Sequence, residues 1–560
     1  MGNRFFNTII FGITVLGATA APMFAQGLAG PYLAASRAFE HGRFDVAARY
    51  YVRAMAADPT NVRLKQSAMI SFITAGEFKT AASIANVMRA NDQTDVFVDL
   101  VSLIDMARKG DFEPGAELIA DHESALSPLV WGLMDAWLKI GAGQSEAGLQ
   151  GFDRMAKTEG LEIYGLYHKS LALAHLGDLS GAADILDGDE SGPLHVNRES
   201  IVIHVGILSG LDRGADALQV LDGAIARGFV DEQLLAFRAE IAAGKLPQHS
   251  TLAGPIYGMS EALMTMADAL SRGEPDRTAL FYARLAQYLR PDSADAALMV
   301  AELLEMEGQF QLAGDAYGVI LPTSSSFKDA EIGRAEAARS AGEADSATAI
   351  LVDLADRFPG DVLVLNALGD IYRGVENFTA SVAAYSQAIE NVGTLDERHW
   401  VLFYTRGIGY ERLKNWPAAE ADFRQALDLS PDQPFVLNYI GYSYIEMGIN
   451  FNEAQEMIET AAELMPSNGY ITDSLGWVLY RIGKFQEAVG PMERAVELLP
   501  VDPIVNDHLG DVLWMVGRKL EAEFQWRRSI SFGPDDVDLE RIKRKLEIGL
   551  DAVLEEEAEN

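Results

Sequence analysis

A spacing of 34 residues recurs along this chain and restricts the folds open to it more than any other feature. Small residues and a proline mark one unit at Gly476, Gly483, Ala488, Ala495 and Pro500. The next unit carries similar residues 34 positions later, at Gly510, Gly517, Ala522, Ser529 and Pro534. A repeat of this length is one supersecondary unit that cannot bury its own apolar face, so it must stack on its neighbours.

Each marked position has a physical role in a pair of helices. Gly476 and Ala488 let the two helices of one repeat approach closely. Gly483 falls between the helices, where a left-handed turn makes a Cβ costly. Pro500 follows the second helix, where no amide hydrogen is needed. The pattern predicts one helical hairpin per repeat and resembles the tetratricopeptide repeat.

The register covers most of the chain. Clear repeats begin near residues 28, 62, 260, 294, 328, 362, 400, 434, 469 and 503, and weaker ones begin near 97, 128, 163 and 198. Residues 232–259 break the register with two prolines and several glycines. We therefore predict an all-α fold, an α-solenoid of tetratricopeptide repeats that forms a right-handed superhelix with a concave groove.

Five segments follow from this register. We predict a signal peptide at 1–25, an irregular repeat array at 28–231, a break or linker at 232–259, a regular array at 260–536, and a capping helix with an acidic tail at 537–560.

The N-terminus has the pattern of a secretory signal peptide. Arg4 and the α-amino group precede an apolar run from about Phe5 to Leu16, and small residues follow. The run is shorter than the roughly 20 residues that a spanning helix needs. We expect export, with cleavage after Ala20 or Ala25 and at most peripheral membrane association. The alternatives are an uncleaved anchor or a buried first helix.

Composition narrows the function classes. The 560 residues include 82 acidic and 45 basic side chains, a net charge of -37, which disfavours nucleic acid as a partner. The chain contains no cysteine, which excludes disulfides, thiolate catalysis, cysteine-bound metal centres and a lipidated N-terminal cysteine. The acidic balance fits either a solvated surface or a basic partner.

No motif for catalysis or cofactor binding has the required spacing. The glycines around Gly476 to Lys484 are seven apart, and Phe485 stands where a phosphate-binding loop needs Ser or Thr. His508 lies beside Asp507 and near Asp511, but we interpret it as a packed histidine on a first helix. We predict a protein that is not an enzyme and that binds no cofactor or metal.

The concave face of the superhelix is the expected binding surface. In each first helix, positions 2, 5, 9, 12 and 13 are expected to face it. Applied to the later repeats, this register gives the predicted groove residues Asn366, Asp370, Arg373, Tyr404, Arg412, Asn438, Tyr442, Asp473, Trp477, Tyr480, Arg481, Asp507, Asp511 and Trp514.

These side chains suit recognition of a protein or peptide segment. Four of the five residues at position 5 are Asn or Asp, which can hydrogen-bond the peptide groups of an extended ligand. Arginines at positions 12 and 13 can clamp carboxylates, and the aromatic residues can hold side chains. The structural alternative is hydrogen bonding and packing between adjacent first helices. Trp526 sits at a core position of a second helix.

Longer runs carry a more specific resemblance. VLNYIGYSYIEMGINFNEAQEMIETA, ITDSLGWVLYRIGKFQEAV and DPIVNDHLGDVLWMVGRKLEAEFQWRRSI resemble a family of exported proteobacterial tetratricopeptide-repeat proteins, over about residues 255–535. Some relatives are periplasmic adaptors that present substrates to a carboxyl-terminal processing protease. The resemblance implies a periplasmic adaptor with a protease and its substrates as partners, although this chain lacks the lipidated cysteine of those relatives.

Three hypotheses from different classes of protein remain open at this point. The first is a scaffold or adaptor whose groove binds a protein segment and delivers it to an envelope protease. The second is a structural component of an outer-membrane secretion or polysaccharide-export assembly. Neighbouring genes would separate the two. An enzyme with a site outside the known motifs is the third hypothesis.

Overall fold

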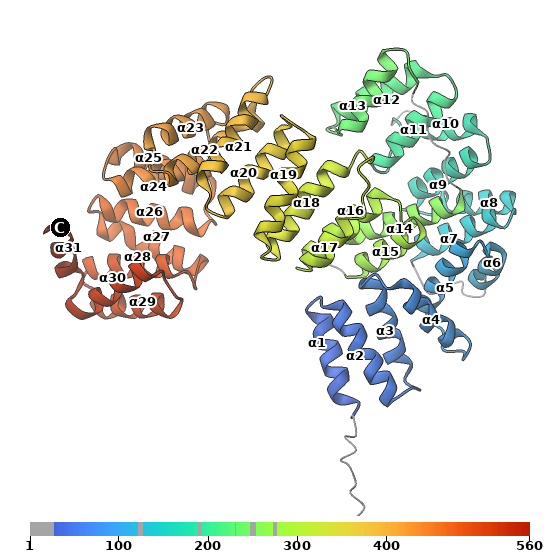
Figure 1. Ribbon diagram of the computed structural model, residues 1–560, viewed down its shortest axis with the longest axis horizontal. Helices are drawn as coiled ribbons and strands as arrows, with labels where there is room; N and C mark the ends of the chain where they lie inside the picture. Colours follow the sequence, from blue (N-terminus) through green and yellow to red (C-terminus); the bar gives the residue numbers. More distant parts are fainter. Residues whose placement is uncertain are drawn as a thin grey trace, which may run out of the picture. The chain divides into compact units, whose positions relative to one another are not determined.

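The protein folds as a succession of helical hairpins (Figure 1). The computed structural model describes residues 27–120, 127–188, 192–229, 231–246, 254–272 and 277–559. Within these ranges it contains thirty-one α-helices, one short 3₁₀ helix and no β-strand. The predicted all-α solenoid of tetratricopeptide repeats is confirmed. The predicted signal peptide, residues 1–25, lies outside the described residues.

The chain divides into two compact units, Met1–Ala337 and Ala338–Asn560, referred to below as unit 1 and unit 2. The division falls within helix α18, away from the predicted break at 232–259. That break is a feature of repeat register, and it stays a prediction. Among the described helices, none combines the length and the apolar character needed to cross a membrane.

The helices of unit 1 are α1 Ala29–Glu40, α2 Phe44–Ala57, α3 Val62–Thr74, α4 Phe78–Arg89, α5 Val96–Lys109, α6 Phe112–Ala120, α7 Pro128–Gly141, α8 Ser145–Met155, α9 Glu162–His175, α10 Leu179–Asp187, α11 Arg198–Gly210, α12 Gly214–Ala226, α13 Glu232–Ala242, α14 Pro255–Ser271, α15 Arg277–Leu289, α16 Ala294–Met306, α17 Phe310–Tyr317 and most of α18 Phe327–Ser340. Those of unit 2 are α19 Ala344–Arg357, α20 Val362–Gly374, α21 Phe378–Asn391, α22 Trp400–Arg412, α23 Trp416–Leu429, α24 Pro434–Met447, α25 Phe451–Leu464, α26 Gly469–Arg481, α27 Phe485–Leu498, α28 Pro503–Met515, α29 Lys519–Ser531, α30 Asp536–Ile548 and α31 Leu550–Glu559.

The repeat residues form the hairpins as their chemistry requires. Gly483, between α26 and α27, has φ of 82°, the left-handed region in which a Cβ is strained. Gly476 has no such backbone need, but a Cβ there would lie 2.6 Å from Cγ of Met492 on the partner helix. Asp502 begins α28 by accepting a hydrogen bond from the amide of Val505. The 34-residue pattern thus encodes both the turn and the close approach of each pair.

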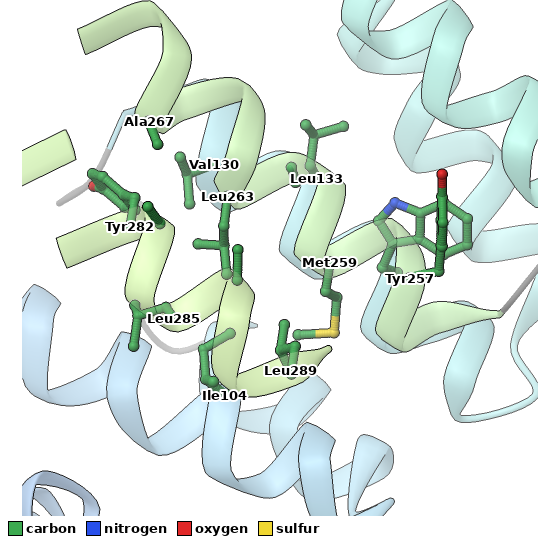
Figure 2. Close-up of a cluster of buried hydrophobic side chains, with 14 of the residues drawn as sticks. Ile104, Val130, Leu133, Tyr257, Met259, Leu263, Ala267, Tyr282, Leu285 and Leu289 are labelled. Carbon is green, nitrogen blue, oxygen red and sulfur yellow. The ribbon is translucent and has the colours of Figure 1, made fainter. Parts of the chain in front are cut away.

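Unit 1 departs from a simple array, because one of its own hairpins lies against the first helices of four others. Helix α14 packs on α7 and α9, and α15 packs on α3 and α5. Figure 2 shows Met259 and Leu263 of α14 beside Val130 and Leu133 of α7. All four side chains are fully buried.

Polar and aromatic contacts fix this hairpin in place. The ring of Tyr288 on α15 stacks on Phe78 with a centroid distance of 3.5 Å. The guanidinium of Arg108 donates a 2.9 Å hydrogen bond to the carbonyl oxygen of Leu289, at the end of α15. A Cβ at Gly258 of α14 would lie 1.9 Å from the ring of Trp137, so glycine is required where the two helices cross. Unit 1 therefore carries an internal occupant on its first helices.

Candidate binding groove

Unit 2 contains a pocket of about 650 Å³ along its first helices α22, α24, α26 and α28. It is referred to below as the unit 2 groove. The residues that line it are Glu411, Arg412, Lys414, Trp416, Asn438, Tyr439, Tyr442, Ser443, Glu446, Met447, Tyr470, Asp473, Ser474, Asp502, Ile504 and Val505. It spans four consecutive repeats, so a bound segment would contact each of them.

Four of the fourteen predicted groove residues line this pocket: Arg412, Asn438, Tyr442 and Asp473. Each comes from the register position assigned to the concave face. The register therefore brings together side chains from three different helices, 61 positions apart at the extremes, from Arg412 to Asp473. Their role in binding stays a prediction.

The centre of the groove is formed by α24. Oδ1 of Asn438 is buried and accepts no hydrogen bond from any described residue. Burial raises the pKa of the neighbouring Tyr442, with the carboxylate of Glu446 adding to the effect, so its phenol stays protonated at neutral pH. A buried amide oxygen without a donor is costly in a folded chain. Oδ1 of Asn366, at the same repeat position but outside the pocket, is buried and unpaired in the same way, so this feature is not specific to the groove. The partly buried Tyr442 offers its phenol to a ligand's polar atoms.

Three further predicted residues are held in contacts between helices. The indole Nε1 of Trp477 donates a 2.7 Å hydrogen bond to Glu446, and the guanidinium of Arg481 lies 3.2 Å from the same carboxylate. The Trp477 ring stacks on Tyr480 of the same helix, with ring centroids 4.8 Å apart, and on His508 of α28, with ring centroids 3.9 Å apart. These contacts match the structural alternative of packing between adjacent first helices.

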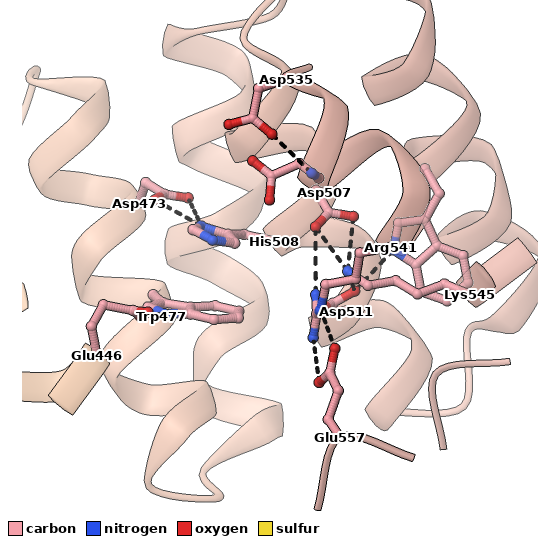
Figure 3. Close-up of polar contacts among 12 residues, drawn as sticks. Glu446, Asp473, Trp477, Asp507, His508, Asp511, Asp535, Arg541, Lys545 and Glu557 are labelled. Carbon is pink, nitrogen blue, oxygen red and sulfur yellow. Dashed lines mark hydrogen bonds and ion pairs between the residues drawn. The ribbon is translucent and has the colours of Figure 1, made fainter. Parts of the chain in front are cut away.

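Asp507 and Asp511 are not open to a ligand in this structure. Nζ of Lys545, on α30, lies 2.8 Å from Asp507 and 2.6 Å from Asp511 (Figure 3). The Lys545 side chain is fully buried, and burial together with the Asp511 carboxylate raises the pKa of Asp507 to about 6. The role of these two residues in binding stays a prediction. The chain's own ammonium group occupies the position in which a ligand was expected.

Asp473, on the neighbouring first helix α26, also takes part in a contact between helices. Asp473 lines the groove, and it also holds Nδ1 of His508 at 3.0 Å. Burial opposes a charge on His508, but the carboxylates of Asp473, Asp507 and Asp511 outweigh it and raise the pKa of His508. Trp514, near the C-terminal end of α28, donates a hydrogen bond from its indole Nε1 to Asp551 of α31.

The remaining predicted residues lie outside the pocket. Asn366 donates to Asp370 at 3.2 Å, and Arg373 bonds Asp370 at 3.0 Å and the hydroxyl of Tyr385. Tyr404 packs edge-to-face on Tyr439, with ring centroids 5.9 Å apart. The structure thus brings the predicted set together only in part.

Several lining residues were not among those predicted. Tyr470 and Ile504 occupy position 2 of their helices, so the register alone would have found them. Met447 lies one residue beyond position 13, and Asp502 is a helix N-cap. Lys414 and Trp416 belong to the turn into α23 and its first residue, for which the repeat pattern gives no signal.

Comparison with known proteins gives a local match to the repeat family. Residues 366–434 match the family described as "Tetratricopeptide repeat". TPR repeat-containing protein PA4667 of Pseudomonas aeruginosa is 36% identical over 83 residues, which cover 15% of this chain and 14% of that relative's length.

Among solved structures, a tetratricopeptide repeat protein from Parabacteroides merdae has a TM-score of 0.37 and 14% identity, covering 44% of this chain and 96% of that one. Yeast Tom70 has a TM-score of 0.36 and 12% identity, covering 95% of this chain and 99% of that one.

Proposed function

We propose that this protein is a non-catalytic scaffold that binds a segment of another protein in the unit 2 groove. The observation that carries the proposal is the pocket of about 650 Å³ across four first helices, with Asn438 and Tyr442 of α24 among the residues that line it. Tetratricopeptide folds generally bind protein partners, and residues 366–434 match the tetratricopeptide-repeat family. A concave, partly apolar surface with a few polar groups is the usual form of a recognition site.

The finer proposal is a periplasmic adaptor that presents substrates to an envelope protease. Its support is the signal-like pattern of residues 1–25 and the resemblance of about residues 255–535 to exported repeat proteins. Fractionation of cells that express the full chain tests the location, because a mature protein that begins at residue 21 or 26 should appear in the periplasm. Uncleaved protein in the cytoplasm would contradict it.

Site-specific photo-crosslinking tests the groove itself. A photoreactive amino acid replaces Tyr442 in the full chain, and a matched variant carries it at Glu497, an exposed position on the second helix α27. Irradiation in cells should attach a defined protein to the Tyr442 variant and not to the Glu497 variant. Equal labelling from both positions would remove the claim that the groove is the binding surface.

A further inference from the structure

We infer that the segment held in the unit 2 groove is an amphipathic α-helix rather than an extended peptide. The inference rests on the proposed function, because it names the form of the partner at the same site. Three observations carry it: the occupant of the first helices in unit 1, the spacing of apolar side chains along unit 2, and the charges at the groove's end.

In unit 1, the surface formed by the first helices is already covered by helices of the same unit. Its first helices α3, α5, α7 and α9 pack against α14 and α15 of the same chain. The contact is apolar and closely fitted, as the burial of Met259 and Leu263 and the space left at Gly258 show. First helices of this solenoid therefore accept a helix as an occupant.

A row of apolar side chains runs along unit 2 at position 2 of successive first helices: Leu363, Val401, Phe435, Tyr470 and Ile504. The first four are between 37% and 60% exposed, and Tyr470 and Ile504 line the groove. Exposed apolar groups that recur in a row indicate an unfilled contact surface. This set is referred to as the apolar row.

The spacing of the apolar row fits a helix. Neighbouring packed helices lie about 8–10 Å apart, so the row offers one apolar contact roughly every 10 Å. In an α-helix, residues i and i+7 share one face and lie about 10.5 Å apart. In a strand, side chains on one face recur at about 6.6 Å and 13 Å, and neither distance matches the roughly 10 Å between contacts of the apolar row. A helix with apolar residues seven apart meets each repeat in turn.

The end of the groove adds a requirement on charge. Arg412 and Lys414 line it with side chains that are 58% and 84% exposed, and each lies 3.7 Å from the single carboxylate of Glu411. Two cations facing one anion leave a positive edge beside α22, whereas Glu446, Asp473 and Asp502 make the rest of the lining acidic. The partner helix therefore carries an acidic residue where it meets α22, beside its apolar stripe.

The test measures the spacing of attachment points on the partner. Photoreactive residues replace Phe435, Tyr470 and Ile504 in three variants of the full chain, with Glu497 as the control position. Mass spectrometry then identifies the partner residue joined to each. A helix predicts attachment points about seven residues apart for successive positions, because about 10 Å corresponds to seven residues at 1.5 Å each. An extended chain predicts about three.

Each result decides the question. A spacing near seven supports the helix, and a proline at the centre of the identified segment should then weaken its binding at least tenfold. A spacing near three, or binding unaffected by proline, overturns the helix while the proposed function stands. Attachment to a second copy of this chain overturns the partner. No labelling above the Glu497 control from any of these positions or from Tyr442 ends the proposed function.

Discussion

The first helices of the two units have the same place in the repeat but are covered in different ways. In unit 1, nearly every position from Val98 to Ala107 of α5 is buried, because α15 packs on that helix. In unit 2, α24 leaves Asn438, Tyr439 and Tyr442 only partly buried, facing a pocket. An apolar first helix requires an occupant from its own chain, whereas one with tyrosines and amides can stay open to a partner.

The occupants differ in chemistry as well as in extent. The α14–α15 hairpin of unit 1 is held mainly by apolar burial. At the end of unit 2, α30 is held through the ammonium group of Lys545 between Asp507 and Asp511. Apolar contacts lose stability in proportion to the atoms removed, but a buried ion pair fails sharply when one partner is lost. The two contacts should therefore respond differently to substitution.

The largest effect is expected from Lys545→Ala. It removes the buried cation from two carboxylates, a loss that typically costs about 3–5 kcal/mol. Arg541, whose Nη1 lies 3.4 Å from Asp511 and 3.9 Å from Asp507, offsets part of that cost. Hydrogen exchange of α28 to α31 should rise strongly, while exchange in unit 1 stays unchanged. Lys543→Ala is the control, because that side chain is half exposed and bonded to Glu540 within one helix turn. Equal exchange in both variants would show that the ion cluster does not hold α30.

Gly258→Ala tests the fit of the internal occupant in unit 1. The new methyl group would overlap the ring of Trp137, so α14 must shift, at a cost of about 3 kcal/mol. The same substitution at Gly490 on α27 meets no atom within 4 Å and should be neutral or slightly stabilising. Thermal unfolding monitored by circular dichroism should show a lower midpoint temperature for the unfolding of unit 1 in Gly258→Ala, and no such decrease in Gly490→Ala. Matching melting curves for the two variants would contradict the close fit.

Glu261 on α14 makes the occupant of unit 1 sensitive to pH. Burial raises its pKa from 4.5 to about 7, with the carboxylates of Glu199 and Asp295 adding and hydrogen bonding from Asn197 opposing. Because the folded state holds the proton more tightly, its stability rises as pH falls from about 7 toward 4.5. At higher pH the buried charge costs up to about 3 kcal/mol.

Glu261→Gln isolates this contribution. A glutamine oxygen can still accept the hydrogen bonds from Tyr167 and Asn197. The variant should unfold at higher urea than the parent at pH 8, and the two should converge toward pH 5. Glu240→Gln, at an exposed position of α13, should follow the parent at every pH. A parent whose stability in unit 1 does not change between pH 5 and 8 would exclude the effect.

Much of the fold followed from the sequence, because the repeat is a local code. A glycine that needs φ of 82° and a glycine that meets a neighbouring side chain act within one hairpin, so Gly483 and Gly476 could be interpreted without knowing the rest. The packing of α14 on α7 could not be predicted in this way, because it joins residues more than 100 positions apart. A signal was present in α7, where Asp135 and Lys139 are the only charged side chains among fourteen residues, which indicates a helix buried on most sides.

The site was predicted in part for the same reason. The register correctly brings Arg412, Asn438, Tyr442 and Asp473 to one pocket, since it specifies which way a side chain faces. It does not specify what already lies there. Lys545 belongs to the capping helix, 34 residues from Asp511, and its buried ammonium group is a single-residue choice that periodicity cannot show.

The smallest expected change in stability belongs to Asn438→Ala, and it separates a binding residue from a structural one. Oδ1 of Asn438 is buried without a donor, so removing the amide loses no hydrogen bond, and alanine favours the helix by about 0.5 kcal/mol. Asn366→Ala is the matched control at the same repeat position, where Oδ1 is likewise unpaired but Nδ2 donates a hydrogen bond to Asp370 whose loss costs about 1 kcal/mol. In urea unfolding of unit 2, the midpoint urea concentration of Asn438→Ala should therefore be higher than that of Asn366→Ala. If Asn438 serves the partner, photo-crosslinking from Tyr442 should fall in Asn438→Ala although the protein is at least as stable as the parent. Retained crosslinking with unchanged stability would assign this amide no role in either folding or binding.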